Sequence, residues 1–205
     1  MNPKFLKAES FFDFESFEHS SLFENCNYVW EGLSGIASYL EHHLHGNVAT
    51  VGCFRTPLPQ TVVLWDGRIW REGFDLLDGD ITRGAFRVRI QGEEVEDAAV
   101  LYAGSILWDD RIYIGAGSVI EPGAIIKGPT IIGLNTEVRQ GAYVRGDCII
   151  GDRCVVGHAT EVKASILLND ARAGHFAYIG DSILGNSTNL GAGAKLANFR
   201  LRGET

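Results

Sequence analysis

Three basic residues recur at intervals of eighteen positions and could together bind an anion. Lys127, Arg145 and Lys163 form this series within residues 97–205, where acidic and basic side chains nearly balance. Neighbouring cations repel one another unless an anion lies between them, and phosphate accepts hydrogen bonds from both lysine and arginine. The spacing therefore favours a phosphate-binding column. The alternative is a solvated column neutralised by nearby carboxylates, those of Glu121, Glu137 or Glu161.

A histidine that follows this series could exchange a proton with a substrate. Imidazole titrates near neutral pH, which suits a general base. His175 falls within residues 174–177, four positions at which the sequence repeat described next is interrupted. Irregular points in repeat proteins map to loops, often on the binding face. We therefore consider His175 a candidate catalytic base, with a structural corner residue as the alternative.

Both candidates belong to a six-residue repeat, which must position them. Aliphatic residues occupy every sixth position from Ile114 to Leu168, and the pattern resumes at Tyr178 after the interruption. Most residues four positions later are small. Such hexads predict a parallel β-helix in which three hexads complete one coil of eighteen residues. Residues eighteen apart should then stack on neighbouring coils, about 4.8 Å apart.

Small residues and glycines fit the corners of such coils. Cys148 and Cys154 occupy the small inward position, so we expect both thiols to be buried and unpaired. The four cysteines show no Cys-x-x-Cys spacing, which disfavours a zinc ribbon or a redox pair. Of the 25 glycines, five follow aliphatic positions at corners where we expect a positive φ. They are Gly115, Gly133, Gly151, Gly157 and Gly191.

The whole chain is acidic, and its acidity is concentrated at the front. The 205 residues include 18 basic and 26 acidic side chains, a net charge of −8. This balance argues against a general nucleic-acid binder, whose domain is strongly basic. No run of 18 apolar residues and no apolar stretch after the first lysines are present, so we expect a cytoplasmic protein that does not enter membranes.

Three regions are expected along the chain. Residues 1–48 form an acidic, aromatic-rich helical segment, in which residues 5–23 lie across a surface and bury their rings singly. Helical spacing and a Ser21–Glu24 capping box predict one helix over about residues 22–45. Residues 49–100 form a short β-hairpin region, with turns at Asp66-Gly67 and Gln91-Gly92. Residues 101–205 form the β-helix.

The segment 174–199 carries a more specific pattern than the hexads. It resembles the acetyltransferase domain of the bifunctional N-acetylglucosamine-1-phosphate uridyltransferases and their archaeal sugar-1-phosphate nucleotidylyltransferase relatives, within the hexapeptide-repeat transferases. The resemblance extends back to Arg145 and implies a mainly β fold, a left-handed parallel β-helix, in a homotrimer. The matching residues are His175, Tyr178, Asp181, Asn189, Ala192, Asn198 and Phe199.

The resemblance also implies a role for each of these residues except Asp181. His175 would be the general base on the amino group of glucosamine-1-phosphate as it attacks acetyl-CoA, the co-substrate. Arg145 and Lys163 would bind the phosphate, and Tyr178 and Asn189 the sugar. Ala192, Asn198 and Phe199 would lie beside acetyl-CoA.

Two departures from this family keep other functions open. No upstream nucleotidyltransferase domain is expected in residues 1–100, and the chain ends soon after Asn198, so the acetyl-CoA site is expected to be incomplete. The leading hypothesis is a sugar-phosphate N-acetyltransferase. The alternative is a non-catalytic module that binds a sugar phosphate or a nucleotide sugar. A metal-dependent hydration enzyme is disfavoured because only His158 and His175 lie in the repeats, and we predict no metal.

Overall fold

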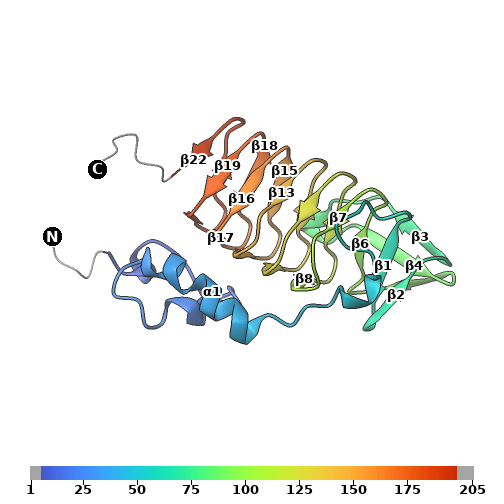
Figure 1. The fold of residues 1–205 in the computed structure, drawn as a ribbon, viewed down its shortest axis with the longest axis horizontal. Helices are drawn as coiled ribbons and strands as arrows, with labels where there is room; N and C mark the ends of the chain where they lie inside the picture. Colours follow the sequence, from blue (N-terminus) through green and yellow to red (C-terminus); the bar gives the residue numbers. More distant parts are fainter. Residues whose placement is uncertain (1–5, 198–205) are drawn as a thin grey trace.

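Aliphatic residues at every sixth position build the core of a left-handed parallel β-helix. The computed structural model describes residues 6–197, in which the coils stack side by side along one axis (Figure 1). Between β6 and β20 the chain completes five coils, and each coil contributes one strand to each of three faces. The predicted fold class is confirmed: the structure is mainly β, with one α-helix and short hairpins before the β-helix.

The three faces of the β-helix are named here by their strands. Face 1 consists of β6 (Ala99–Leu101), β9 (Val119–Ile120), β12 (Glu137–Val138), β15 (Val155–His158), β18 (Arg172–His175) and β21 (Asn189–Leu190). Face 2 consists of β7 (Ile106–Leu107), β10 (Ile125–Ile126), β13 (Tyr143–Val144), β16 (Glu161–Lys163), β19 (Tyr178–Gly180) and β22 (Lys195–Leu196). Face 3 consists of β8 (Ile112–Ile114), β11 (Thr130–Ile132), β14 (Cys148–Ile150), β17 (Ile166–Leu167) and β20 (Ile183–Leu184).

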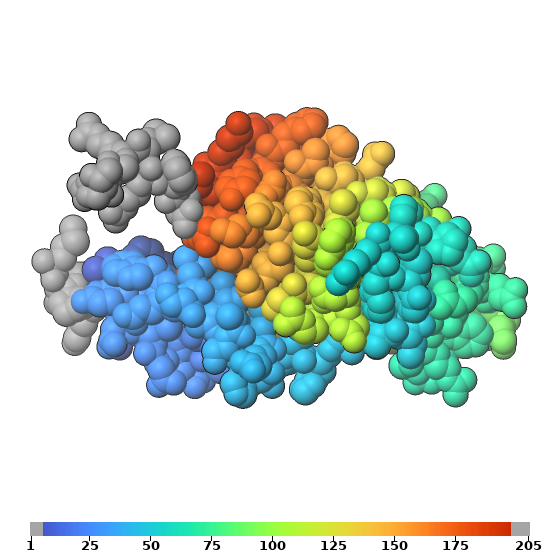
Figure 2. All heavy atoms as spheres, viewed as in Figure 1, coloured from blue at the N-terminus to red at the C-terminus, as the bar shows by residue number. Residues whose placement is uncertain are grey.

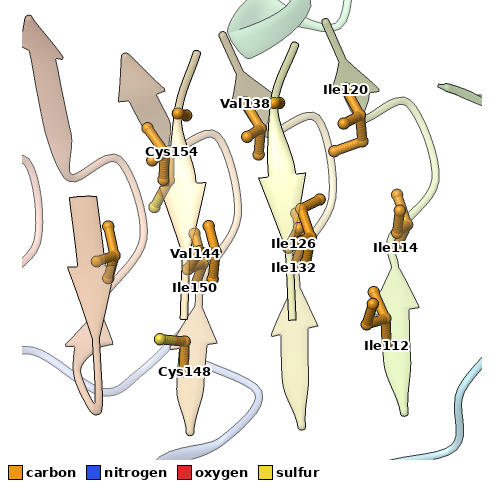
Figure 3. Packing of buried hydrophobic residues seen from close by; sticks show 14 of the residues in the cluster. Ile112, Ile114, Ile120, Ile126, Ile132, Val138, Val144, Cys148, Ile150 and Cys154 are labelled. Atoms are coloured by element: carbon orange, nitrogen blue, oxygen red, sulfur yellow. The ribbon is translucent and has the colours of Figure 1, made fainter. Parts of the chain in front are cut away.

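Side chains inside the prism alternate between large and small (Figure 3). Ile120, Ile126 and Ile132 are fully buried, as are both Cys148 and Cys154, which are free thiols as predicted. Burial raises the pKa of each of these two thiols to about 12. An apolar residue from each face thus fills the prism, and the sulfurs behave as small apolar groups.

Small inward hydroxyls also connect successive coils. Ser118 Oγ donates to the carbonyl oxygen of Gly133 at 2.6 Å and accepts from the backbone N–H of Thr136 at 2.8 Å. Thr136 Oγ1 repeats the arrangement one coil on, with Gly151 and Cys154. Because corners leave backbone groups outside the strand ladders, these hydroxyls satisfy groups that would otherwise be buried without a partner.

The register changes at a different place from the one that the sequence pattern indicated. Glu161 pairs with Tyr143, eighteen residues earlier, whereas Ile166 pairs with Ile149, seventeen residues earlier. The corner between β16 and β17 has therefore lost one residue, and Leu167 rather than Leu168 enters the prism. The predicted four-residue slip at residues 174–177 was wrong, since Ala173 and Ile179 keep the six-residue spacing.

Four of the five corner glycines, all except Gly191, are needed for close approach rather than for a positive φ. Neither Gly115 nor Gly133, nor the other three corner glycines of that series, has a positive φ, so that expectation was wrong. A Cβ at Gly115 would lie 2.5 Å from the carbonyl carbon of Gly133 on the next coil. Adjacent corners therefore touch backbone to backbone, and only glycine leaves the necessary space.

The N-terminal segment covers face 3. Its elements are η2 (Ala8–Ser10), η3 (Ser20–Phe23) and α1 (Glu31–His43), and Figures 1 and 2 show this segment in blue along one side of the coils. Ile36 and Leu40 of α1 pack in one apolar cluster with Ile131 and Ile149 of face 3. The rings of this segment contact one another, with Phe14 4.8 Å from Phe23, and are not buried singly as expected.

The helix begins nine residues later than its predicted start. The Glu31 carboxylate accepts hydrogen bonds from the backbone N–H groups of Asn27 at 2.7 Å and Tyr28 at 3.3 Å, which caps the chain there. No capping box forms at Ser21 and Glu24 in the described structure, where η3 makes a separate turn. Gly32 allows this turn to pack on α1, because a Cβ at residue 32 would collide with the Phe23 ring.

Two antiparallel units extend and cover face 1. The strands β1 (Val62–Trp65) and β2 (Arg68–Trp70) form the predicted hairpin, and β1 pairs with β6. A second sheet consists of β3 (Phe74–Leu77), β4 (Arg87–Ile90) and β5 (Glu93–Val95), and its apolar side packs with Val100 and Val119 of face 1. Short turns η4 (Ala49–Val51) and η5 (Ile81–Arg83) connect these elements. Face 2 is different, since none of its outward apolar residues joins the three apolar clusters.

Candidate functional site

The candidate site lies across face 2, between two corners of the β-helix. Glu161 pairs with Tyr143 on one side and with Tyr178 on the other, so these three outward side chains stack on successive coils. The corner after face 2 carries the cation column. The corner before it carries His158 and His175, which are paired between β15 and β18. The eighteen-residue spacing thus placed the three cations correctly on one edge.

Two of the three cations have carboxylate partners within the chain. Arg145 Nη1 donates to Glu161 Oε1 at 2.7 Å, and Lys163 Nζ donates to Asp181 Oδ2 at 3.2 Å. The hydrogen bond to Glu161 raises the pKa of the Arg145 guanidinium. Both pairs are solvent-accessible, and exposed ion pairs contribute little to stability. An incoming phosphate would therefore compete with weakly held carboxylates.

The remaining carboxylates proposed as neutralising groups are engaged elsewhere. Glu137 binds Arg139 on face 1 at 2.8 Å, and Glu121 accepts from the backbone N–H of Gln140 at 2.7 Å. Lys127, the first cation of the column, lies over the Trp108 ring at 4.4 Å and near the Tyr143 ring at 5.4 Å. Of the three carboxylates proposed to neutralise the column, only Glu161 forms an ion pair with one of its cations.

His175 is exposed at the end of β18, where the chain turns from face 1 to face 2. Its backbone carbonyl accepts a hydrogen bond from Gly193 at 3.1 Å, which fixes the corner on the following coil. The Phe176 ring lies 6.4 Å from the His175 ring and meets the edge of His158 at 5.2 Å. His158 Nδ1–H donates to the carbonyl of Gln140 at 2.9 Å, so its Nε2 faces away from that bond. The rings of His158, Phe176 and His175 therefore lie next to one another along the corner before face 2.

Tyr178 lies flat across its own strand because residue 180 is glycine. A Cβ at Gly180 would lie 2.7 Å from Tyr178 Cε1 and 2.8 Å from the Tyr178 hydroxyl. The ring consequently extends from the His175 corner toward the opposite edge, where its hydroxyl interacts electrostatically with Arg145. The structure thus brings Tyr178, Arg145 and Lys163 together on face 2.

The other predicted site residues lie around the same corner or outside the described part. Asn189 is exposed on face 1, where it pairs with Arg172, so the corner separates it from Tyr178. Ala192 is exposed on the next corner beyond His175. Asn198 and Phe199 lie outside residues 6–197. Of the three residues expected beside acetyl-CoA, the structure therefore describes only Ala192.

Neither a metal cluster nor a spanning helix is found in the part of the chain that the structure describes. No group of three or more His, Cys, Asp or Glu side chains there is arranged to hold a metal ion. His19, His43 and His45 line one cavity of about 170 Å³ with Glu18, yet they do not meet that condition. No helix among residues 6–197 is long and apolar enough to cross a bilayer.

Sequence reasoning assigned no role in the site to several residues that shape it. Asp181 and Gly180 carried no spacing signal, because each acts on a side chain of its own or the preceding coil. His158 was considered only as a metal ligand, although it lies on the corner paired with His175. A seventeen-residue comparison, allowing for the shortened corner, would have aligned His158 with His175.

Comparisons with known proteins agree with this architecture. The family model of the GMPPB C-terminal domain matches residues 126–205. The "Bifunctional protein GlmU" of Nitrosospira multiformis is 35% identical over 106 residues, covering 52% of this chain and 22% of that protein. The protein of the same name from Pseudomonas putida is 29% identical over 146 residues, covering 63% of this chain and 32% of that protein.

These matches cover less than a third of each relative's length, so they concern a domain rather than a whole protein. The matched part contains the candidate site, since Arg145, Lys163 and His175 all lie within residues 126–205. Hexads, a three-faced β-helix and both comparisons lead to the same assignment. The chain thus contains a β-helix of hexapeptide repeats that is similar to part of the GlmU proteins.

Proposed function

We propose that the chain is a sugar-phosphate acyltransferase, which transfers an acetyl group from acetyl-CoA to the amino group of an amino-sugar 1-phosphate such as glucosamine-1-phosphate. The proposal includes a homotrimer in the cytoplasm. One observation carries it: Arg145, Lys163 and Tyr178 lie together on face 2, and His175 lies at the corner from which Tyr178 extends. The face carries none of the cover that packs on the other two, which leaves it free for substrate and for neighbouring chains.

The geometry supports a specific orientation of the acceptor. Two residue steps separate Glu161 from Lys163, roughly 7 Å along an extended strand. A sugar over the Tyr178 ring would thus place its phosphate between Arg145 and Lys163, where the phosphate would replace Glu161 and Asp181. Arginine and lysine both form charge-assisted hydrogen bonds to phosphate. The amino group would then face the His175 corner.

His175 would act on the amine as the new bond forms. The amine nitrogen attacks the thioester carbonyl, and the nitrogen–carbon bond forms while the carbon–sulfur bond breaks. The imidazole takes the proton that the nitrogen loses and delivers it to the departing thiolate, so CoA leaves as a thiol. An imidazole ring can both accept and donate a proton, so one side chain can serve both transfers.

A non-catalytic module that binds a sugar phosphate or a nucleotide sugar is the second candidate. It is favoured by the ion pairs of Arg145 with Glu161 and of Lys163 with Asp181. It is also favoured by the surroundings of His175, whose ring forms no ion pair with an orienting carboxylate among residues 6–197. Such a module would keep the phosphate column and would need no acyl donor.

Separate binding measurements distinguish the two candidates. Calorimetric titration of the full chain with glucosamine-1-phosphate and, independently, with acetyl-CoA should show that both bind. Arg145→Gln should weaken the binding of the sugar phosphate about tenfold or more, since a charge-assisted hydrogen bond is lost, and should leave the affinity for acetyl-CoA unchanged. Arg83→Gln, on exposed η5, is the matched control. Sugar-phosphate binding without acetyl-CoA binding would favour the module, and binding of neither would contradict both candidates.

A further inference from the structure

An exposed group of aromatic and cationic side chains lies at the beginning of the cation column. Lys127 Nζ lies 4.4 Å from the Trp108 ring centroid, and the Arg55 guanidinium lies 5.8 Å from the same ring. Tyr143 flanks Lys127 at 5.4 Å. Trp108 is 36% exposed although it is a large apolar side chain. We call Arg55, Trp108 and Lys127 the indole cluster.

The two cations of the indole cluster differ from Arg145 and Lys163 in having no acidic partner among the described residues. Neither Lys127 nor Arg55 forms an ion pair within the described residues 6–197, whereas Arg145 and Lys163 both do. The adjacent carboxylate of Asp109 is occupied, because it accepts backbone hydrogen bonds from Arg111 at 3.0 Å and Gly128 at 3.2 Å. Two positive charges therefore flank an accessible indole, and no carboxylate of residues 6–197 forms an ion pair with either of them.

Local departures from the regular repeat bring the cluster together. The corner between β7 and β8 is longer than the next, since Ile106 pairs with Ile125 nineteen residues on, whereas Ile112 pairs with Thr130 eighteen residues on. The extra residue lies in the corner that contains Trp108. Arg55 arrives from a distant segment, with a φ of 63° and with its backbone N–H bonded to the carbonyl of Leu107 at 2.8 Å. A non-glycine residue held in this conformation is fixed by its surroundings.

We infer that the indole cluster binds an aromatic ring that carries phosphate groups, which in chemical terms is a nucleoside diphosphate. An indole face stacks on any nucleobase, and arginine and lysine beside it bind phosphate oxygens. Lys127 and Arg145 lie on neighbouring coils about 4.8 Å apart, so the phosphates can lie along the edge of face 2. This site requires neither His175 nor an acyl donor and goes beyond the proposed acetyl transfer.

Titration of the full chain with ADP tests the inference, with inorganic pyrophosphate as a probe that has the phosphates but no base. Trp108 emission should be quenched by ADP and not by pyrophosphate. Trp108→Leu and Lys127→Gln should each lower the affinity for ADP by about tenfold, which is the loss expected when base stacking or one phosphate contact is removed. Trp108→Leu should leave pyrophosphate affinity unchanged. Trp30→Leu is the matched control, because Trp30 is 50% exposed on the N-terminal segment.

Three results would overturn the inference. The first is equal affinity for ADP and pyrophosphate, which would exclude base stacking. The second is unchanged ADP affinity in both Trp108→Leu and Lys127→Gln, provided that circular dichroism shows the variants folded. The third is a change of oligomeric state in Trp108→Leu without nucleotide binding by the unmodified chain, which would assign the cluster to contacts between copies. Failure of acetyl transfer alone leaves the ADP result decisive, because the ADP assay is read at Trp108 and Lys127, which the proposed acetyl transfer does not use.

Discussion

At the scale of single residues, the two side chains proposed to bind phosphate form ion pairs that a ligand would have to displace. Arg145 is bonded to Glu161, and Lys163 to Asp181. The eighteen-residue spacing correctly predicted that the three cations lie on one edge of the β-helix, because each coil places its corresponding residue at the same edge. It named Glu161 as a possible partner but not Asp181, which approaches Lys163 only through the strand pairing of β16 with β19.

Removing the competing carboxylate should therefore improve acceptor binding. In Glu161→Gln, Arg145 keeps its place but loses its ionic partner, so we expect severalfold tighter binding of glucosamine-1-phosphate by calorimetry. Glu137→Gln serves as the control, because Glu137 pairs with Arg139 on face 1. Weaker binding in Glu161→Gln would mean that this carboxylate holds the arginine in its binding position or contacts the sugar itself.

Gly180 should control the position of the Tyr178 ring. Gly180→Val introduces a Cβ at 2.7 Å from Tyr178 Cε1, so the ring must move off the strand. We expect this variant to weaken the binding of glucosamine-1-phosphate by about as much as Tyr178→Ala does. The double variant should weaken that binding no further. Gly191→Ala is the control, since no atom lies within 4 Å of a Cβ there. Additive losses in the double variant would argue against this linkage.

At the scale of elements, the regular coils were predictable and the irregular corners were not. From Ile114 to Val162 the aliphatic positions of the sequence pattern are those of the prism. Beyond Val162 the six-residue spacing selects Leu168, but the shortened corner places Leu167, one residue earlier, in the prism. The predicted N-terminal helix was similarly too long, because helical periodicity begins before Glu31, the first residue of α1, whose carboxylate accepts a hydrogen bond from the backbone N–H of Asn27.

Burial within the prism predicts how the thiols react. Because burial raises the pKa of Cys148 and Cys154 to about 12, both remain protonated thiols at pH 8. Cys53, only half-buried, should be alkylated in the native protein, as mass spectrometry of labelled peptides would show. Cys148 and Cys154 should react only after denaturation. Rapid labelling of either in the native protein would contradict the inward placement of the hexad cysteines.

The same shift sets a pH dependence of stability. The unfolded thiols ionise near pH 9, whereas the folded ones remain neutral up to about pH 12. The free energy of unfolding should thus keep the contribution of these thiols below pH 9 and lose it between pH 9 and 12. Cys148→Ala should make denaturant midpoints fall less steeply over this range. An unchanged slope would indicate that other groups dominate the alkaline loss.

At the scale of the whole molecule, two faces of the β-helix are covered and one is left for function. The N-terminal segment packs on face 3, and the sheet of β3, β4 and β5 packs on face 1. Face 2 keeps its cations, its phenol rings and the adjoining histidine corner accessible. Sequence composition indicated an acidic protein as a whole, and the structure places three positive side chains on one edge of the single uncovered face of residues 6–197.

The release of free thiol from acetyl-CoA in the presence of glucosamine-1-phosphate tests the central claim most directly. The account predicts acceptor-dependent thiol release that falls about a hundredfold or more in His175→Ala, as expected when a general base is removed. His42→Ala, an exposed histidine on α1, should retain full activity. Thiol release that is absent from the unmodified chain, or that is equal in His175→Ala, would contradict acetyl transfer by His175.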